Sequence, residues 1–177
     1  MLSIATLISC SKRDDSPPEP EETWDPTPYD LQIPAGFPDM MIPEDNPMTV
    51  EGVTLGRKLF NDPILSADNT QSCASCHGQG FGFTDNGRRF STGIDGVAGN
   101  RNAMPVINTG WMPDLFWDGR DPGLESQALE PVPNPIEMHQ PWPDALAKLN
   151  AHLNYPDLFF TAFGTREIDS SHVVKAI

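Results

Sequence analysis

Apolar residues recur with helical spacing only in short stretches of this chain. The first stretch is 47–60, for which the pattern predicts a helix with Asn46 as its cap and Pro47 at its first position. The apolar residues on one face of this helix are Val50, Val53, Leu59 and Phe60. Asn61-Asp62-Pro63 is expected to end it, because proline cannot continue a helix.

Several shorter helices are predicted further along the chain. One begins at Asn69-Thr70, and the others cover about 122–130, 145–153, 157–163 and the stretch from Ser171 onward. Residues 78–102 are rich in glycine and carry almost no helix signal. A loop of this length in a compact domain is usually functional. The pattern therefore predicts an all-α, loop-rich fold.

The first 28 residues differ in character from the rest. Residues 1–10 are apolar and end in a lipobox-like Leu7-Ile8-Ser9-Cys10, so we interpret them as the remnant of a lipoprotein signal, with an apolar terminus and an incidental thiol as the alternative. Residues 11–28 are acidic and proline-rich, which predicts a disordered linker. The folded domain is placed at 29–177. It opens with an extended proline-rich segment whose apolar residues are expected to lie along the folded surface: Leu31, Ile33, Phe37, Met40, Met41 and Ile42.

Composition and charge limit the possible partners. The net charge of −14 disfavours nucleic acid through like-charge repulsion. With 38% hydrophobic residues, 19 prolines and 14 glycines, the chain is lean for a self-sufficient protein core. A large apolar cofactor would supply the missing packing. We find no segment long enough for a transmembrane helix and expect membrane attachment only through a lipid anchor.

The chemistry of the chain centres on Cys73-Ala74-Ser75-Cys76-His77. Two thiols three positions apart, followed at once by a histidine, form the attachment motif of c-type haem. Each cysteine adds to a haem vinyl group, and the adjacent histidine becomes the proximal iron ligand. A zinc half-site is a poor alternative, because zinc takes four ligands and no second thiol pair exists. A thioredoxin-like pair is also disfavoured, because no βαβ pattern surrounds the motif.

Three blocks of sequence, in this order, resemble the N-terminal haem domain of bacterial di-haem cytochrome c peroxidases. They are LGRKLFNDPILSADNTQSCASCHGQGFGFTDNGRRFSTG, GNRNAMPVINT and FWDGRDPGLESQALEPVPNPIEM. The wider family includes the methylamine-utilisation di-haem enzymes, and the resemblance runs from about Val50 to the end. It implies a cytochrome c-like haem domain in which Cys73 and Cys76 carry one covalent haem c and His77 ligates its iron.

The same resemblance implies roles for four further residues. Trp117 matches the tryptophan that lies between the two haems and is associated with electron transfer. Gln127 and Glu137 match a glutamine and a glutamate of the distal haem pocket, with Glu137 as the acid and base for peroxide. Asn102 matches a residue that contributes to a calcium site between the domains. Without the family resemblance, each of these four residues would be interpreted as a core, solvent-exposed or loop residue.

The sequence departs from the family pattern at Ile94, where peroxidases with a blocked resting haem have a distal histidine. Isoleucine cannot ligate iron, so we hypothesise a haem whose sixth position is vacant or water-bound. The remaining candidates for a sixth ligand are Met104, Met112, Met138 and His139, and each is expected to be structural.

A second departure is at the end of the chain. Family members continue into a second domain with another haem motif, whereas this sequence stops inside a helix that Asp169 caps. We interpret the chain as a fragment rather than a shortened form.

These observations predict an exported peroxidase domain, periplasmic or anchored as an outer-membrane or cell-surface lipoprotein. It would reduce hydrogen peroxide with electrons from a small c-type cytochrome or a cupredoxin. Three alternatives stay open: a non-catalytic electron-transfer cytochrome, a di-haem oxidase of another substrate, and a haem-bearing surface or sensor lipoprotein.

Overall fold

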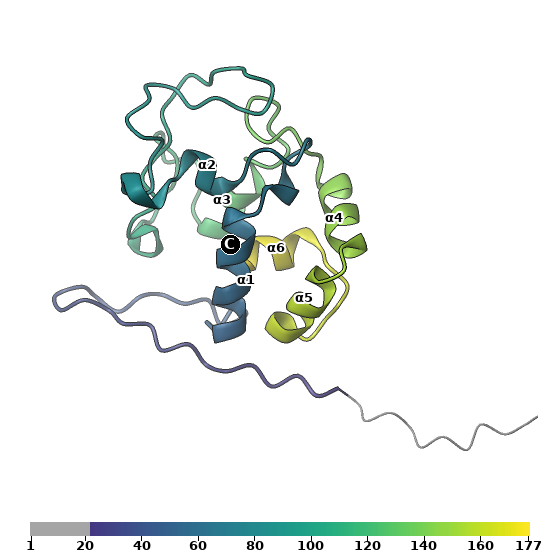
Figure 1. The fold of residues 1–177 in the computed structure, drawn as a ribbon. Coiled ribbons are helices and arrows are strands. Elements are labelled where there is room, and N and C mark those ends of the chain that lie inside the picture. Colours follow the sequence, from purple (N-terminus) through teal and green to yellow (C-terminus); the bar gives the residue numbers. More distant parts are fainter. Residues whose placement is uncertain (1–21) are drawn as a thin grey trace, which may run out of the picture.

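The fold is known from a computed structural model that describes residues 22–177, and in this range it contains helices and no strand. The elements, in chain order, are α1 (Val50–Asn61), η1 (Pro63–Leu65), α2 (Cys73–Cys76), η2 (Gln79–Phe81), η3 (Thr109–Trp111), α3 (Leu124–Leu129), α4 (Trp142–Ala151), α5 (Tyr155–Phe163) and α6 (Ser170–Ala176). The all-α, loop-rich prediction is confirmed, and Figure 1 shows the loops gathered at one end of the helices. The predicted lipobox and most of the predicted linker lie outside the described residues.

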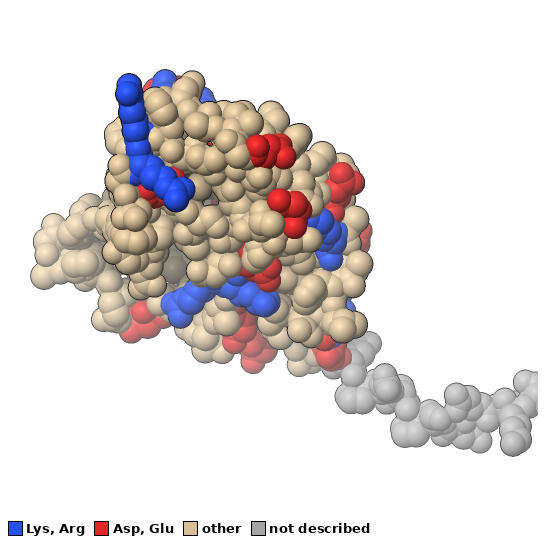
Figure 2. Space-filling view, turned by 45° about the horizontal axis from the view of Figure 1, so that its top comes forward, with Lys and Arg blue, Asp and Glu red and all other residues tan. Residues whose placement is uncertain are grey.

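The surface carries charges of both signs. Figure 2 shows acidic and basic side chains interspersed on one face of the molecule, so this face has no continuous patch of one sign. None of the helices in the described part of the chain is both long and apolar enough to cross a membrane.

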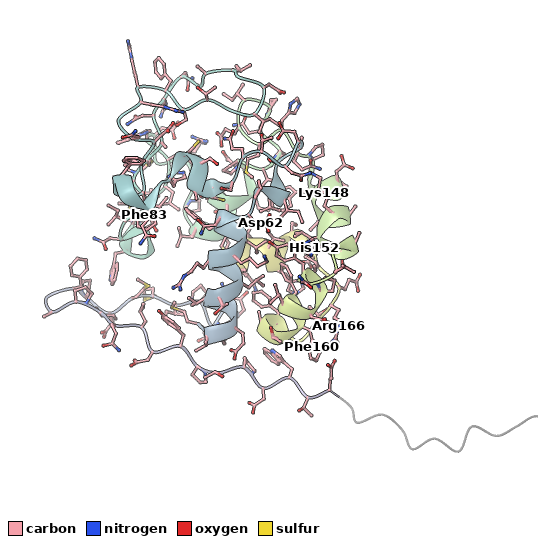
Figure 3. The ribbon with its side chains drawn as sticks, viewed as in Figure 1. Asp62, Phe83, Lys148, His152, Phe160 and Arg166 are labelled. Atoms are coloured by element: carbon pink, nitrogen blue, oxygen red, sulfur yellow. The ribbon has the colours of Figure 1, made fainter. Side chains whose placement is uncertain are left out.

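An extended segment, 22–48, runs along the helices before α1 begins (Figure 1). At its start the indole N–H of Trp24 donates to the Thr161 carbonyl at 3.3 Å, close to Phe160 and Arg166, which are labelled in Figure 3. Further on, the ring of Phe37 packs edge-on against Trp111 with centroids 5.0 Å apart. The predicted wrapping segment is therefore present, although Met41 is 91% exposed and takes no part in the packing.

Helix α1 begins three residues later than predicted. Thr49, not Asn46, is its N-cap, and the Thr49 hydroxyl accepts from the Gly52 N–H at 3.0 Å. The side chain of Asn46 instead donates to the carbonyl of Lys175 in α6, also at 3.0 Å. Residues 27–29 pair with 48–50 in extended backbone, which keeps Pro47 outside the helix.

Helix α2 also starts later than predicted. Asn69 has a φ of 57°, in the left-handed region, so it cannot lie in a right-handed helix. Ser72 is the N-cap, and its backbone N–H donates to the Ser75 hydroxyl at 3.0 Å. Helix α2 is consequently a single turn that holds both cysteines of the motif. Helix α4 begins three residues earlier than predicted and α5 two residues earlier. Gly164, with a φ of 74°, ends α5 as expected.

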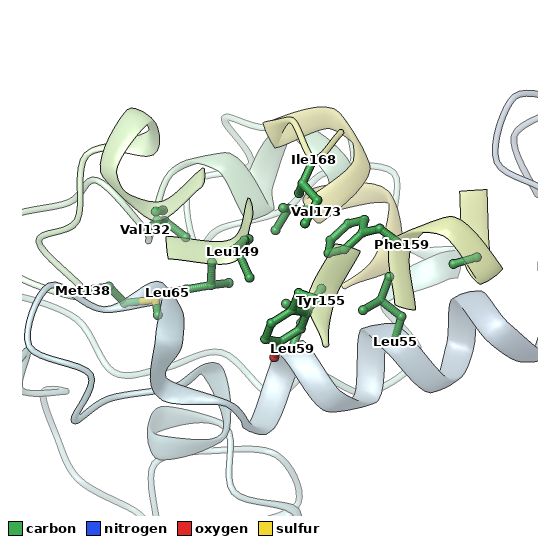
Figure 4. Close-up of a cluster of buried hydrophobic side chains, with 12 residues drawn as sticks. Leu55, Leu59, Leu65, Val132, Met138, Leu149, Tyr155, Phe159, Ile168 and Val173 are labelled. Atoms are coloured by element: carbon green, nitrogen blue, oxygen red, sulfur yellow. The ribbon is translucent and has the colours of Figure 1, made fainter. Parts of the chain in front are cut away.

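The core lies where α1, α4, α5 and α6 meet (Figure 4). Its largest fully buried side chains are Tyr155, Phe159, Leu55, Leu59, Leu65, Leu149 and Val173. Gly56 lets the end of α6 rest on α1, because a side chain at this position would overlap the Ala176 carbonyl. The loops that form the candidate site are packed on one end of this helical core.

Candidate functional site

A cavity of about 510 Å³ lies between α2, α3 and the long loops. This volume falls within the range of roughly 300–1,000 Å³ that is usual for small-molecule and cofactor sites. The segments that form its walls are the motif (71–77), the glycine-rich loop (91–106), the turn before α3 (115–120), α3 itself and residues 131–138. The cavity is assembled from parts of the chain between residues 60 and 138, with Ile177 added from the end of the chain, and the core brings these parts to one end of the helices.

The cysteines of the motif line this cavity, and both are free thiols. Their one-turn helix places them on the same side, because residues three apart share a helix face. Burial raises the pKa of the Cys73 thiol to about 11 and also raises the pKa of Cys76. Both thiols are therefore protonated at neutral pH, unlike the reactive thiolate of a redox Cys-x-x-Cys pair.

His77 follows directly and also lines the cavity. Its Nδ1 lies 3.2 Å from the carbonyl oxygen of Phe83; in the tautomer whose Nδ1–H donates to that oxygen, Nε2 carries the lone pair. Phe83, which is labelled in Figure 3, has a φ of 56° and belongs to a tight turn after α2, which brings its carbonyl back to the imidazole ring. Burial lowers the pKa of His77 and favours the neutral imidazole, the form that binds metals.

Glu137 also lines the cavity and comes from the loop between α3 and α4. Its Oε1 accepts a hydrogen bond from Asn134 Nδ2 at 2.9 Å, and its main-chain carbonyl accepts from the Ile94 N–H at 3.0 Å. Burial raises the pKa of this half-buried carboxyl group, while the hydrogen bond from Asn134 and the charge of Arg120 act in the opposite direction. A carboxyl group whose pKa is raised is protonated more readily and can both take up and release a proton during a reaction.

Trp117 lies at the rim and is 52% exposed. Its indole N–H donates to the Asn102 carbonyl at 3.0 Å, which ties the rim turn to the end of the glycine-rich loop. Beside it, the Arg120 guanidinium lies 3.4 Å from the centroid of the Phe116 ring and pairs with Glu130 at 2.7 Å. The rim is thus held in place by an indole hydrogen bond, a cation–π contact and an ion pair.

All residues that the sequence singled out for the site line this one cavity: Cys73, Cys76, His77, Asn102, Trp117, Gln127 and Glu137. Asn102 has no acidic cluster around it, since residues 22–177 hold no group of three or more His, Cys, Asp or Glu side chains arranged for a metal ion.

The residues discussed as a sixth ligand lie in different places. Met104 lines the cavity, and Met138 lines it while being packed in the core. Met112 and His139 are outside the cavity lining, and the imidazole of His139 pairs with Asp95 at 2.6 Å. Ile94 is also outside the lining. Among residues 22–177, His77 is the one histidine in the cavity wall.

The sequence reading missed Asn134, Arg120 and Gly93. Asn134 precedes a proline in a proline-rich stretch, a pattern typical of a turn stabilised by the asparagine side chain, and this was the available signal. Nothing local marks the role of Gly93 or the pairing of Arg120 with Glu130, because these contacts join residues more than 40 and 10 positions apart.

The residues present fit a covalently attached haem. Two thiols and a neutral imidazole meet on one wall of a large cavity, as the motif requires. The Ser91 hydroxyl lines the cavity, is buried, and makes no hydrogen bond within residues 22–177, so it is available to a polar group of a bound molecule.

Comparison with known proteins agrees with this fit. The model of the family described as di-haem cytochrome c peroxidase matches residues 50–177. The methylamine utilization protein MauG of Methylorubrum extorquens is 40% identical over 136 residues, which is 76% of this chain and 38% of MauG. The cytochrome c peroxidase Ccp of Escherichia coli is 44% identical over 113 residues, covering 63% of this chain and 24% of Ccp.

Solved structures give the same result. A MauG-like protein associated with microbial copper homeostasis superposes with a TM-score of 0.77 at 36% identity, covering 84% of this chain and 45% of that one. The diheme peroxidase BthA from Burkholderia thailandensis superposes with a TM-score of 0.64 at 25% identity, covering 74% of this chain and 37% of that one. The chain therefore spans less than half the length of these relatives.

Proposed function

The chain belongs to the di-haem cytochrome c peroxidase family, and from this membership and the geometry of the cavity we propose that it is a haem-c domain that reduces hydrogen peroxide. The proposal rests chiefly on one observation: Cys73, Cys76 and His77 share a cavity with Glu137, a carboxyl group whose pKa is raised by burial. The electrons would come from a small c-type cytochrome or a cupredoxin outside the cytoplasm.

In this proposal the motif holds the cofactor. Cys73 and Cys76 would each form a thioether with a vinyl group, and His77 would ligate the iron through Nε2, with Phe83 orienting the ring. When bound, the haem supplies the redox chemistry that the side chains cannot provide. Asn102, whose main-chain carbonyl accepts from Trp117 at the rim, is retained as a proposed calcium contact between domains.

Glu137 would move the proton. Reduction of hydrogen peroxide to two waters consumes two electrons and two protons, and cleavage of the O–O bond requires that the departing oxygen be protonated. Glu137 takes a proton from one peroxide oxygen and returns it to the other, while the Gln127 amide orients the peroxide. Trp117, at the rim, lies on the side from which electrons enter.

The test compares the holoprotein, matured with covalent haem, with its Glu137→Gln variant. We expect the variant to keep its haem and to lose peroxide-dependent oxidation of a reduced c-type cytochrome by roughly 10²–10⁴-fold. Glu167→Gln is the matched control, because Glu167 is exposed and remote from the cavity lining. Full turnover in Glu137→Gln, or a mature protein without covalent haem, would overturn the proposal.

A second candidate function is oxidation of another substrate by the same haem site. It is favoured by the 40% identity to MauG, whose name places it in methylamine utilization. A screen of organic and protein-bound substrates with peroxide as oxidant separates this function from reduction of peroxide by a redox protein. A purely electron-transferring cytochrome would show no turnover in either assay.

A further inference from the structure

Asn134 is the centre of the turn that carries Glu137. Its main-chain carbonyl accepts from the N–H groups of Glu137, at 3.0 Å, and His139, at 2.9 Å. Its side-chain Oδ1 accepts from the Ile136 N–H at 3.1 Å. The turn therefore depends on this one residue for three hydrogen bonds between positions 134 and 139.

The amide of Asn134 has one possible orientation. Because the Ile136 N–H requires an acceptor, Oδ1 must face it, and Nδ2 then faces Glu137 Oε1 at 2.9 Å. The other carboxylate oxygen, Oε2, has no hydrogen-bond partner among residues 22–177, although Glu137 lines the cavity. The two oxygens of the carboxylate thus have different surroundings: one is held by protein and one is free.

The main chain of Glu137 is fixed independently of this amide. The Ile94 N–H donates to its carbonyl at 3.0 Å, and Gly93 packs so closely against residues 136 and 137 that a side chain there would overlap their backbone. With the main chain fixed, the remaining freedom of Glu137 lies in its side-chain torsions, whose restriction costs conformational entropy. Within the described part of the chain, Asn134 makes the one hydrogen bond that restricts these torsions.

We propose that Asn134 is a positioning residue that anchors Oε1 of Glu137 so that Oε2 is presented to the cavity as the proton-carrying oxygen. This inference rests on the proposed function of Glu137 and goes beyond it by naming the group that orders the carboxylate.

Other charges also act on this carboxyl group. Burial and the neighbouring Glu130 raise the pKa of Glu137, and the hydrogen bond from Asn134 and the charge of Arg120 lower it. The thiols of Cys73 and Cys76, which also face it, would be uncharged thioethers in the mature protein. Loss of the Asn134 donor is therefore expected to raise the pKa of Glu137 further.

The test uses Asn134→Asp in the mature holoprotein. Aspartate keeps the oxygen that accepts from the Ile136 N–H, so the turn is preserved, but it faces Glu137 with a second carboxylate oxygen instead of an N–H donor. If Asn134 only stabilises the turn, Asn134→Asp should react with peroxide at the wild-type rate, and Asn134→Ala should react more slowly. If Asn134 positions Glu137, both variants should react with peroxide more slowly than the wild type.

We expect Asn134→Asp to react with peroxide about 10–100-fold more slowly, with its pH profile displaced to higher pH. A second readout is equilibrium binding of cyanide to the ferric protein, because hydrogen cyanide must give its proton to a nearby base; its pH dependence should shift in the same direction. Haem content should be unchanged. Asn154→Asp is the control, because it adds the same charge at the N-cap of α5, where the side chain makes no cap hydrogen bond.

The double variant Asn134→Asp/Glu137→Gln separates the two proposals. If Asn134 acts through Glu137, adding Asn134→Asp to Glu137→Gln changes the peroxide rate little further. A wild-type rate, pH profile and cyanide affinity in Asn134→Asp, with Glu137→Gln inactive, would overturn the positioning role and leave the proposed function intact. Full activity in Glu137→Gln would overturn both.

Discussion

Gly93 and Glu137 lie so close together that a Cβ on Gly93 would be 2.7 Å from the Glu137 carbonyl oxygen. The next residue, Ile94, donates its N–H to that same oxygen at 3.0 Å. The glycine-rich loop therefore packs directly, backbone to backbone, on the turn that presents the proposed acid and base.

Gly93→Ala is expected to push these two segments apart. Because the contacts of an added Cβ are backbone atoms, which cannot rotate away, we expect a loss of about 1–3 kcal/mol in the free energy of unfolding and a slower reaction with peroxide. Thermal unfolding and stopped-flow mixing with peroxide measure the two effects. Gly80→Ala, in η2, is the control, since a Cβ there would meet no atom within 4 Å. Equal behaviour of the two variants would contradict the packing argument.

The ferric holoprotein is expected to lack the low-spin spectrum of a bis-histidine haem. His77 is the one histidine lining the cavity within residues 22–177, and Ile94, which the family resemblance aligns with the distal histidine, cannot ligate iron and lies outside the lining. Electronic absorption and electron paramagnetic resonance test this, and His139→Gln should leave both spectra unchanged because His139 pairs with Asp95 outside the cavity lining. Met104→Ala examines the methionine in the cavity wall, and a spectral change in that variant would identify it as a ligand.

Trp117→Phe should separate electron entry from peroxide chemistry. The substitution removes the indole at the rim and its hydrogen bond to the Asn102 carbonyl but leaves Glu137 and the motif in place. We expect steady-state oxidation of the reduced cytochrome to slow while the first, single-turnover reaction with peroxide keeps its rate. Trp142→Phe removes an equivalent indole bond, to the Leu129 carbonyl at 3.0 Å, outside the cavity lining. A matching loss in both variants would mean that the effect is structural.

Because of Tyr155, the free energy of unfolding is expected to depend on pH in the alkaline range. Its ring is fully buried in the core, and its hydroxyl donates to Asp62 Oδ2 at 2.7 Å, so burial first, and then the bond and charge of Asp62, raise its pKa well above the usual value (Figure 4). The unfolded chain ionises this group near pH 10 and the folded chain does not. The free energy of unfolding is therefore expected to fall as pH rises above about 10.

Tyr155→Phe tests this. The variant should lose about 1.5–3 kcal/mol at neutral pH, the usual contribution of a hydrogen bond to a charged group, and should show a weaker decline at alkaline pH. Denaturant unfolding between pH 7 and 11 measures both quantities. Tyr29→Phe serves as the control, because Tyr29 is 36% exposed. A wild-type decline in Tyr155→Phe would assign the alkaline sensitivity to other groups.

Much of the local structure could be read from the sequence. The apolar spacing located α1, α4, α5 and α6 to within about three residues, and Gly164 marked the end of α5, because helix propensity and capping act over a few neighbouring residues. The order of cysteines and histidine in 73–77 likewise predicts covalent haem from local geometry alone.

Other features depended on distant contacts. Thr49 replaced Asn46 as the cap of α1 because the Asn46 side chain bonds to Lys175, 129 residues away. The loop before α2 is held by Lys148 of α4, which is labelled in Figure 3. Its Nζ donates to the Ser66 carbonyl at 2.6 Å and to Asn69 Oδ1 at 3.0 Å. No local pattern indicates such partners.

The sequence by itself determined which residues can hold a haem and where most helices form, because both follow from chemistry within a few positions. The tertiary structure alone decided that Glu137 faces the same cavity as His77, with one oxygen held by Asn134 and its backbone held by the loop at Gly93. The physical reason is that hydrogen bonding and close packing between separated segments arise only when the core brings those segments together.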